Sequence, residues 1–235
     1  MSVQITHGSV RRGMRRVLEP GRMTIDAGSA LAVVGINGSG KSSLFMQLAD
    51  TLSSRGTATI TIDGRRASLA YVPQVPALPG WLRTENIAHM FGLGFEALVE
   101  CMPGLHLAEV AGQKASALSV GQRQGLAIAL ALGRRAEVTL LDEPFSALDF
   151  RRRIGALELL AQHCRDGRTV VLSSQSAADL IGLCQHFVVI RDGRYVFNAP
   201  RVGLGADADD RRIEQRLLDL LTLPFPAMEV PTQHY

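Results

Sequence analysis

The feature that most constrains the fold of this chain is the stretch GINGSGKSS, residues 35–43, which directly follows the apolar run ALAVV. Gly35, Gly40, Lys41 and Ser42 fit the pattern G-x-x-x-x-G-K-[ST], and the stretch lies between a predicted strand and a predicted helix. In this context the pattern forms a loop whose glycines let backbone N–H groups point at phosphate oxygens. We therefore predict that this loop binds a nucleoside triphosphate.

The side chains of the loop have separate expected roles. Lys41 can reach the β- and γ-phosphates, and the hydroxyl of Ser42 can ligate Mg²⁺. Lys41 and Lys114 are the only lysines of an arginine-rich chain, so chance alone explains a lysine at this position poorly. The alternative is a glycine-rich turn without function. We expect four more residues of the loop to contact the triphosphate, namely Asn37, Gly38, Ser39 and Ser43.

Short β-branched runs alternate with helical patterns along the chain. Near-continuous apolar strands followed by helices predict a largely parallel sheet covered on both faces. Turn signals beside the early strands indicate an antiparallel β subdomain next to it. The expected fold is an α/β phosphate-loop NTPase core. The predicted strands span residues 3–6, 30–35, 57–62, 68–72, 137–142, 169–174 and 186–193, and the predicted helices 42–50, 121–132, 153–164 and 176–184.

Two regions depart from this alternation. Over about residues 75–130 proline, glycine and short helical patterns predict an inserted helical subdomain. We divide the chain into a domain of residues 1–200 and a C-terminal helix and tail of residues 201–235. The helix is expected in DADDRRIEQRLLDLL, because acids stand at its start and its apolar residues fall on one face: Ile213, Leu217, Leu220 and Leu221.

Composition limits the class of protein. Hydrophobic residues make up 46% of the 235 residues and the net charge is only +3, so we expect a globular chain and no nucleic-acid partner. Three cysteines that lie far apart indicate reduced thiols of a cytosolic protein. The longest apolar run, LAIALALG, is far shorter than the roughly 20 residues that span a bilayer. Any membrane role would therefore need a partner protein.

A second segment, VTLLDEP, ends an apolar strand with two acids, Asp142 and Glu143. Ligands of open α/β sheets collect at the carboxyl edge of the strands, where this pair would lie. Asp142 would hold Mg²⁺ through water, and Glu143 could orient and polarise the attacking water. Taken alone, the pair could equally form a surface turn. Beside a phosphate loop, it favours hydrolysis of the bound triphosphate.

Two further segments narrow the class. LSVGQRQ, residues 118–124, precedes Glu143, and SALD, residues 146–149, follows it directly. A generic phosphate-loop ATPase has no need of either segment. Together with Gln74 in YVPQ, their order and spacing resemble the nucleotide-binding subunit of ATP-binding cassette (ABC) transporters. The resemblance covers nearly the whole chain, and it implies that residues 1–200 form an ABC ATPase domain.

The resemblance implies a site shared between two chains. In this family two subunits close head to tail with two ATP molecules at their interface, so we expect a homodimer or a heterodimer with a second ABC ATPase subunit. Ser119 and Gly121 would meet the γ-phosphate bound by Lys41 of the opposite chain, with Gln122 beside them. Asp149 would lie at the dimer seam and couple the two sites.

The resemblance also implies a membrane-spanning partner. Gln74 would sense Mg²⁺ and the γ-phosphate, and the segment from Gln74 to Asn86 would form the dock for a short helix of the permease subunits. Trp81, the only tryptophan, is either a contact there or a packing residue of the helical region. ATP would close the dimer and hydrolysis would reopen it. The chain is accordingly expected in the cytoplasm, on the inner face of the cell membrane.

Three positions depart from the family pattern. Gln175 stands where a histidine is expected to steady the attacking water. Glutamine can donate a hydrogen bond to phosphate but cannot shuttle a proton, so we expect slower hydrolysis with ATP binding kept. The aromatic residue that stacks on adenine is absent, and the guanidinium of Arg12 stands near that place, where it could stack on the base or remain solvated. In LSVGQRQ, Val120 stands where the family has the first of two adjacent glycines, while the second, Gly121, is kept.

Two other functions remain open at this stage. Gln175 favours a regulatory module that binds ATP but hardly hydrolyses it, whereas Glu143 favours an active ATPase. A soluble ABC ATPase that acts on DNA, ribosomes or iron–sulfur assembly is the other alternative. DNA-repair relatives carry long coiled-coil insertions and translation-associated relatives carry two cassettes, and neither fits within 235 residues.

The arginine cluster 151–153 directly follows SALD. It could touch a partner, but we interpret it as the solvated start of a helix. Four histidines, His89, His106, His163 and His186, show no metal-ligand spacing and are expected on the surface or in packing roles.

Overall fold

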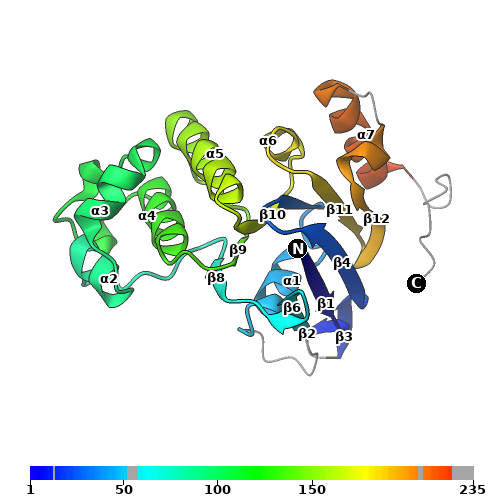
Figure 1. Ribbon diagram of the computed structural model, residues 1–235, viewed down its shortest axis with the longest axis horizontal. Helices are drawn as coiled ribbons and strands as arrows, with labels where there is room; N and C mark the ends of the chain where they lie inside the picture. The colour runs from blue at the N-terminus through cyan, green and yellow to red at the C-terminus, as the bar shows by residue number, and fades with distance from the viewer. Residues whose placement is uncertain (13, 52–57, 206–208, 224–235) are drawn as a thin grey trace.

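A six-stranded sheet forms the centre of the molecule in the computed structural model (Figure 1), which describes residues 1–12, 14–51, 58–205 and 209–223. Its strand order is β12-β11-β5-β10-β9-β8, and neighbouring strands are parallel except β11 and β12. The predicted α/β fold with a mostly parallel sheet is confirmed. The strands are Ala30–Val34 (β5), Leu69–Val72 (β8), Val138–Leu141 (β9), Thr169–Ser174 (β10), His186–Arg191 (β11) and Arg194–Pro200 (β12).

Helices cover this sheet and also build a separate part at one end of the molecule, which contains α2, α3 and α4 (Figure 1). Three short 3₁₀ turns, at Pro103–Leu105, Leu107–Val110 and Ala115–Ala117, lie between α3 and α4. The predicted helix over residues 176–184 is shorter than expected, because Gly182 interrupts it. The helices are Lys41–Leu48 (α1), Thr84–Met90 (α2), Phe95–Cys101 (α3), Val120–Gly133 (α4), Phe150–Arg165 (α5), Ala178–Ile181 (α6) and Asp210–Thr222 (α7).

A second, antiparallel sheet has the order β4-β1-β6-β7. β1 (Ser2–His7) pairs antiparallel with β6 (Ala58–Ile62), as the turn signals beside these segments predict. The sequence patterns do not predict β12 or four further strands, because each contains arginine that interrupts the apolar alternation. These four strands are Val10–Arg12 (β2), Arg15–Leu18 (β3), Gly21–Asp26 (β4) and Arg65–Arg66 (β7).

The apolar residues of β5 pack alternately against two different clusters, which explains why its sequence is a continuous apolar run. Ala32 and Val34 belong to the cluster formed with the helical part and α7. Leu31 and Val33 belong to the cluster formed with α1, β1 and β6. Because successive side chains of a strand point to opposite faces, a strand buried on both faces must be apolar throughout. The sheet is thus held rigidly between two cores, and its carboxyl edge is a firm support for a site.

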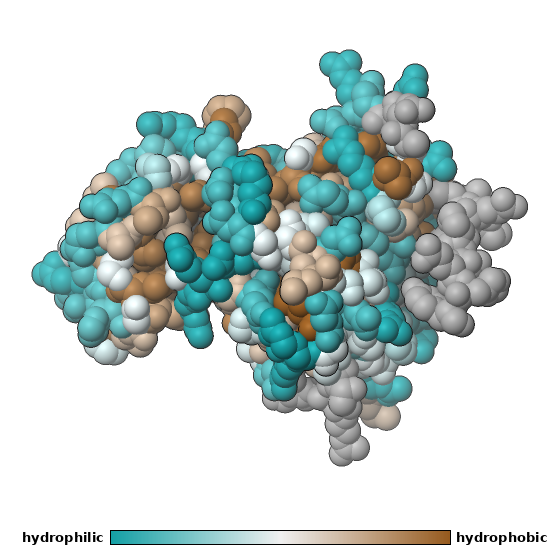
Figure 2. Space-filling model, viewed as in Figure 1, coloured by the Kyte–Doolittle hydropathy of each residue, from teal (hydrophilic) through white to brown (hydrophobic). Residues whose placement is uncertain are grey.

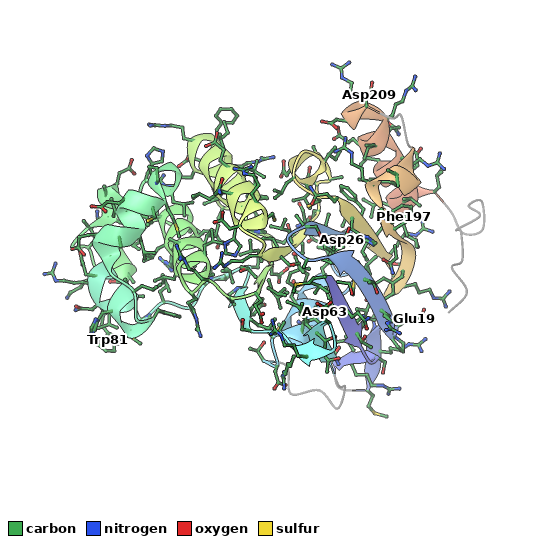
Figure 3. The ribbon with its side chains drawn as sticks, in the orientation of Figure 1. Glu19, Asp26, Asp63, Trp81, Phe197 and Asp209 are labelled. Atoms are coloured by element: carbon green, nitrogen blue, oxygen red, sulfur yellow. The ribbon has the colours of Figure 1, made fainter. Side chains whose placement is uncertain are left out.

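The C-terminal helix α7 confirms the predicted amphipathic pattern. Asp209 lies at the start of this helix (Figure 3) and caps it, because its carboxylate accepts a hydrogen bond from the backbone N–H of Arg212 at 2.9 Å. Residues 224–235 of the expected tail lie outside the described residues. None of the helices in the described ranges is long and apolar enough to cross a membrane. The four apolar residues named for this helix are all buried: Ile213, Leu217, Leu220 and Leu221.

His163 of α5 makes the stability of this fold sensitive to mild acid. Burial, and then the positive charge of Arg168, lower the pKa of His163 to about 4 from its ordinary value of 6.5. The unfolded chain therefore binds this proton more readily, so the contribution is complete above about pH 6.5 and is lost as the pH falls toward 4. We expect the free energy of unfolding to drop by about 1–2 kcal/mol between pH 7.5 and pH 5 in urea titrations.

The control for this prediction is His163→Gln, which keeps a polar side chain near Thr139 but does not titrate. The variant should show a smaller loss of stability over the same pH interval. If the loss is unchanged, the acid sensitivity belongs to His7 and His186, whose pKa values are also lowered by burial.

Candidate functional site

The phosphate loop joins the end of β5 to the start of α1, and its glycines are required by backbone geometry. Gly40 has φ +113°, and a Cβ at this residue would lie 3.0 Å from the carbonyl oxygen of Val17. At Gly35 a Cβ would lie 2.5 Å from the Ser39 hydroxyl and 2.6 Å from the carbonyl oxygen of Ile190. A side chain at either position would force the loop apart. The loop predicted from GINGSGKSS therefore has the tight form that presents backbone N–H groups at a helix start.

Lys41 is buried in this loop with its ammonium group held on three sides. Its Nζ donates to the carbonyl oxygens of Gly35 at 2.7 Å and Ile36 at 3.2 Å, and it lies 3.2 Å from Oε1 of Glu143. Both side chains of this ion pair are less than a tenth exposed. The Lys41–Glu143 pair thus brings the expected phosphate-binding cation and the expected water-polarising acid into direct contact.

The two acids follow β9 at the carboxyl edge of the sheet. The backbone N–H of Asp142 donates to the carbonyl oxygen of Val72 at 2.9 Å, and Ser173 of β10 contacts both acids. Glu143 has φ +49°, a left-handed conformation that costs a non-glycine residue on the order of 1–3 kcal/mol. Such strain persists only where the surroundings fix the residue. The position of Glu143 is therefore determined by neighbouring strands rather than by local preference.

One cavity of about 260 Å³ opens at this edge of the sheet. It brings together Arg12, most of the phosphate loop, Gln74 and Glu143, which are distant in the chain and were all predicted from the sequence. Three other residues predicted in the loop and after β9 do not line it: Gly35, Ser39 and Asp142. Val17, which lines the cavity together with Arg12, was not predicted from the sequence, because an isolated valine in an arginine-rich stretch carries no chemical signal. The lining residues are Arg12, Val17, Asn37, Gly38, Gly40, Lys41, Ser42, Ser43, Gln74 and Glu143.

The donor atoms around this cavity suit Mg²⁺ and phosphate. Ser42 and Gln74 line the cavity with hydroxyl and amide oxygens, and Asp142, which is buried next to Glu143, offers carboxylate oxygens; these are the ligand types that Mg²⁺ prefers. The described residues contain no group of three or more His, Cys, Asp or Glu side chains that could hold a metal ion by themselves. Within the same described part, the buried hydroxyl of Ser39 has no hydrogen-bond partner, so it can serve a ligand oxygen that enters the loop. A nucleotide whose phosphate oxygens supply the remaining ligands of Mg²⁺ fits this set of side chains.

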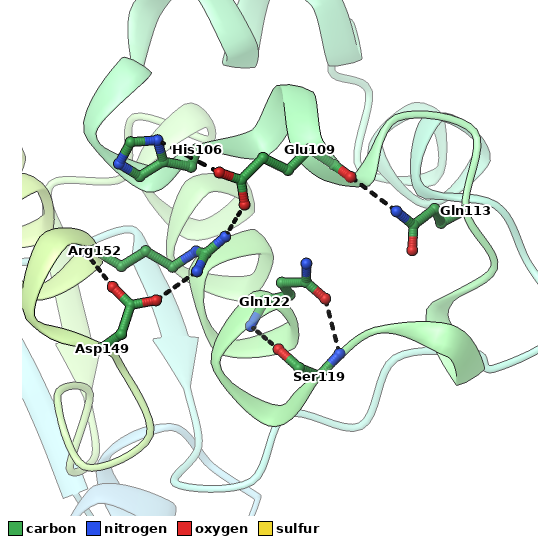
Figure 4. A network of polar contacts seen from close by, with 7 residues as sticks. All are labelled: His106, Glu109, Gln113, Ser119, Gln122, Asp149 and Arg152. Atoms are coloured by element: carbon green, nitrogen blue, oxygen red, sulfur yellow. Dashed lines mark hydrogen bonds and ion pairs between the residues drawn. The ribbon is translucent and has the colours of Figure 1, made fainter.

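The signature segment LSVGQRQ forms the start of α4. Ser119 caps the helix, because its hydroxyl accepts from the Gln122 N–H at 3.1 Å while the Gln122 side chain accepts from the Ser119 N–H at 2.9 Å (Figure 4). A Cβ at Gly121 would lie 2.7 Å from the carbonyl oxygen of Ala147, so only glycine allows the SALD segment to approach this closely. Ser119 is exposed and does not line the cavity of its own chain.

Two arginines next to Asp149, Arg152 and Arg153, show where the sequence interpretation was wrong, whereas Arg151 is exposed as expected. Arg152 is not simply solvated: its side chain is 12% exposed, and it bridges the carboxylates of Asp149 and Glu109 (Figure 4). The carboxylate of Asp149 also caps α5 by accepting from the Arg152 N–H at 2.9 Å. Arg153 forms an ion pair with Asp179. Arg152 therefore fastens the SALD segment to the helical part, which sequence spacing alone could not reveal because Glu109 lies far away in the chain.

Beside the segment Gln74–Asn86 lies an apolar groove of about 370 Å³ between β8 and α4. Pro73, Pro76, Leu78 and Phe91 are among its lining residues. Hydrophobic side chains also reach the surface over the helical part (Figure 2). Trp81 lies at the end of this part with 75% of its surface exposed (Figure 3), so the packing alternative for this tryptophan is wrong.

Gln175 follows β10 and is exposed. It does not line the cavity, so in this single chain the structure does not bring it together with Lys41 and Glu143. The strand that precedes it is nevertheless tied to the phosphate loop, because the Gly35 N–H donates to the carbonyl oxygen of Ser174 at 3.2 Å.

The parallel sheet, the glycine-bound phosphate loop and the acids at the strand end define a phosphate-loop ATPase. The sequence profile of the ABC transporter family matches residues 18–146. The chain belongs to this family, and it is an ATP-binding subunit of an ABC transporter. The predicted resemblance is thereby confirmed, and the alternatives of a soluble ABC ATPase and a weakly hydrolysing regulatory half gain no support.

Similar proteins come from several bacteria. An aliphatic sulfonates import ATP-binding protein of Frankia alni is 34% identical over 236 residues, which cover 94% of each chain. A phosphonates import ATP-binding protein of Pseudomonas aeruginosa is 33% identical over 211 residues, covering 75% of this chain and 76% of the relative. A solved structure titled as the ATP-binding subunit of an ABC transporter shares the fold, with TM-score 0.80 and 22% identity over 93% of this chain and 100% of that chain.

Proposed function

We propose that this subunit hydrolyses ATP at composite sites formed when two such subunits close head to tail, and that the closure powers transport through membrane-spanning subunits. The observation that carries the proposal is that the predicted site residues fall into two separate groups on the single chain. The phosphate loop, Gln74 and Glu143 line one cavity, whereas Ser119 and Asp149 are exposed outside it. A second chain that presents its Ser119 to the cavity would complete the site. The partner is either another copy of this chain or a related subunit.

Within each composite site the described residues have distinct roles. The phosphate loop, Gly35 to Ser43, would hold the phosphates, and Lys41 would exchange its contact with Glu143 for phosphate oxygens. Glu143, released from this ion pair, would orient the attacking water and accept its proton. Mg²⁺, which would neutralise developing phosphate charge, would be held by Ser42, Gln74 and Asp142. Ser119, Gly121 and Gln122 of the opposite chain would add the helix N-terminus of α4 at the γ-phosphate.

Arg12 is proposed to contact the adenine base. The residue lines the cavity on the side of the β2–β3 hairpin, together with Val17. A planar guanidinium can stack on any base, so this contact does not distinguish adenine from guanine. Selectivity for ATP over GTP should therefore be loose.

The apolar groove and Trp81 are proposed to receive a helix of the permease subunits. Exposed Val75 and Trp81 belong to the segment Gln74–Asn86, which also supplies three of the groove-lining residues, Pro76, Ala77 and Leu78. Since the similar proteins are named for import of phosphonates, sulfonates and hemin, we infer that the transporter is an importer. The chain would then lie at the cytoplasmic face of the membrane.

Recovery of the tagged chain from detergent extracts tests this function. We expect a membrane-spanning protein to copurify, and we expect Trp81→Ala to reduce its recovery. Leu218→Ala is the matched control, because Leu218 is an exposed apolar residue of α7, at the other end of the molecule (Figure 1). Recovery of the chain without any membrane-spanning protein would contradict the proposal.

Gln175→His should raise the ATP turnover of the assembled complex. A histidine can carry positive charge toward the γ-phosphate, which glutamine cannot, and we expect a gain of about three- to tenfold in kcat with unchanged ATP binding. Steady-state phosphate release measures the gain. Gln175→Asn, which shortens the amide without adding charge, serves as the control. A turnover that stays equal or falls in Gln175→His contradicts the prediction.

A further inference from the structure

Ser173 is a buried hydroxyl that the roles assigned above do not use. It lies on β10 with 0% of its surface exposed. β10 is flanked by β5 and β9, and it extends beyond the end of β9, because Leu172 already pairs with Leu141. Ser173 is therefore level with Asp142, the first residue after β9. This register places one hydroxyl beside the two acids that end the neighbouring strand.

The hydroxyl of Ser173 uses both of its hydrogen-bonding functions on these acids. Its Oγ donates to Oδ1 of Asp142 at 2.5 Å and accepts from the backbone N–H of Glu143 at 2.8 Å. The carboxylate can only accept and the N–H can only donate, so the position of the hydroxyl proton is fixed. A single side chain thus sets the orientation of the Asp142 carboxylate and the backbone of Glu143.

The backbone of Glu143 needs such support. Its φ of +49° is unfavourable for a residue with a side chain, and the Ser173 contact is made to the N–H at the same residue. Loss of the contact would free the peptide to rotate, and the carboxylate of Glu143 would move away from the cavity and from Lys41. A shift of about 1 Å in a reacting group is enough to cost roughly a hundredfold in rate.

We propose that Ser173 is a positioning residue for ATP hydrolysis: it holds the carboxylate of Asp142 toward Mg²⁺ and the carboxylate of Glu143 toward the attacking water. The inference rests on the proposed function. Ser173 does not reach the substrate itself, because it lies behind the acids and does not line the cavity. Its neighbour Ser174 belongs to the same strand end but contacts the Ser176 N–H and the phosphate loop instead.

The test compares Ser173→Thr with Ser173→Val in the full chain, assembled with its membrane partner. The two side chains have nearly the same shape, and only threonine keeps the hydroxyl. We expect Ser173→Val to lower kcat by at least about tenfold, to leave the KM for ATP within about threefold, and to raise the Mg²⁺ concentration for half-maximal rate. Ser173→Thr should retain most of the wild-type kcat and Mg²⁺ response.

Two further variants separate this effect from general destabilisation. Thr139→Val removes another fully buried hydroxyl, from β9, and should change neither kcat nor the Mg²⁺ response. Equal rates in Ser173→Val and Ser173→Thr would overturn the inference, as would a loss of rate with an unchanged Mg²⁺ response. Glu143→Gln is measured in parallel. If Glu143→Gln stays fully active, the proposed function itself has failed. If Glu143→Gln is inactive while Ser173→Val is active, only the role of Ser173 is rejected.

Discussion

Glu143→Gln is expected to reduce ATP hydrolysis by at least about a hundredfold while ATP binding stays within about threefold. Glutamine has the shape of glutamate but cannot accept a proton from water at neutral pH. The variant also loses the ion pair with Lys41, although the Lys41 ammonium keeps its hydrogen bonds to two carbonyl oxygens of the loop. Phosphate release measures hydrolysis, and titration with a fluorescent ATP analogue measures binding.

Glu137→Gln provides a matched control for this prediction. Glu137 precedes the other end of β9, where Arg65 and Ser68 hydrogen-bond its carboxylate and lower its pKa to about 2. The same chemical change at Glu137 should leave hydrolysis at the wild-type rate, because this carboxylate lies outside the cavity. Comparable activity of Glu143→Gln and Glu137→Gln would show that Glu143 is not the residue that activates water.

The second large expected effect is the recovery of ATP turnover when two inactive variants are combined in one dimer. Lys41→Ala removes the expected phosphate-binding cation, and Ser119→Asp places a negative charge where the γ-phosphate of the opposite site is expected. Aspartate remains a good helix cap, so α4 should still form. Each variant alone should lose at least about a hundredfold in turnover. A mixed dimer, isolated with two different tags, carries one doubly defective site and one site built from wild-type halves.

The mixed dimer is therefore expected to recover turnover at its intact site, up to about half of the wild-type rate, which is the value for two sites without coupling. Ser119→Asn controls for the size of the new side chain, because it keeps the cap without adding charge. Its turnover should exceed that of Ser119→Asp by at least about tenfold. A mixed dimer as inactive as either parent would argue against head-to-tail sites that draw Lys41 and Ser119 from different chains.

The sequence predicts most of the fold because its central strands have strong and simple patterns. β5 and β10 are buried on both faces, so their composition alone indicates a parallel sheet with helices on either side. The phosphate loop is equally clear, since backbone geometry at Gly35 and Gly40 excludes other residues. The five unpredicted strands, β2, β3, β4, β7 and β12, pair at sheet edges or in short hairpins, where neighbouring strands rather than local composition decide the conformation.

Residues that act through contacts across the sheet could not be found in the same way. Ser173 stands in the run VVLSS, and its hydroxyl could have been noticed as a polar group at a strand end, but its partners become known only from the register of β9 against β10. The partner of Arg152 in the helical part, Glu109, is likewise set by tertiary packing. Spacing along the chain carries no information about such pairs.

The helical part and α5 touch through the backbone atoms of two glycines, Gly104 and Gly155. A Cβ at Gly104 would lie 2.5 Å from the Cα of Gly155, so the two backbones touch directly and leave no room for a compressible side chain. Arg152 adds ion pairs one turn earlier in the same helix. We therefore expect this junction to transmit a displacement of the helical part directly to α5, and we expect larger residues at Gly104 or Gly155 to uncouple transport from ATP hydrolysis while the hydrolysis itself continues.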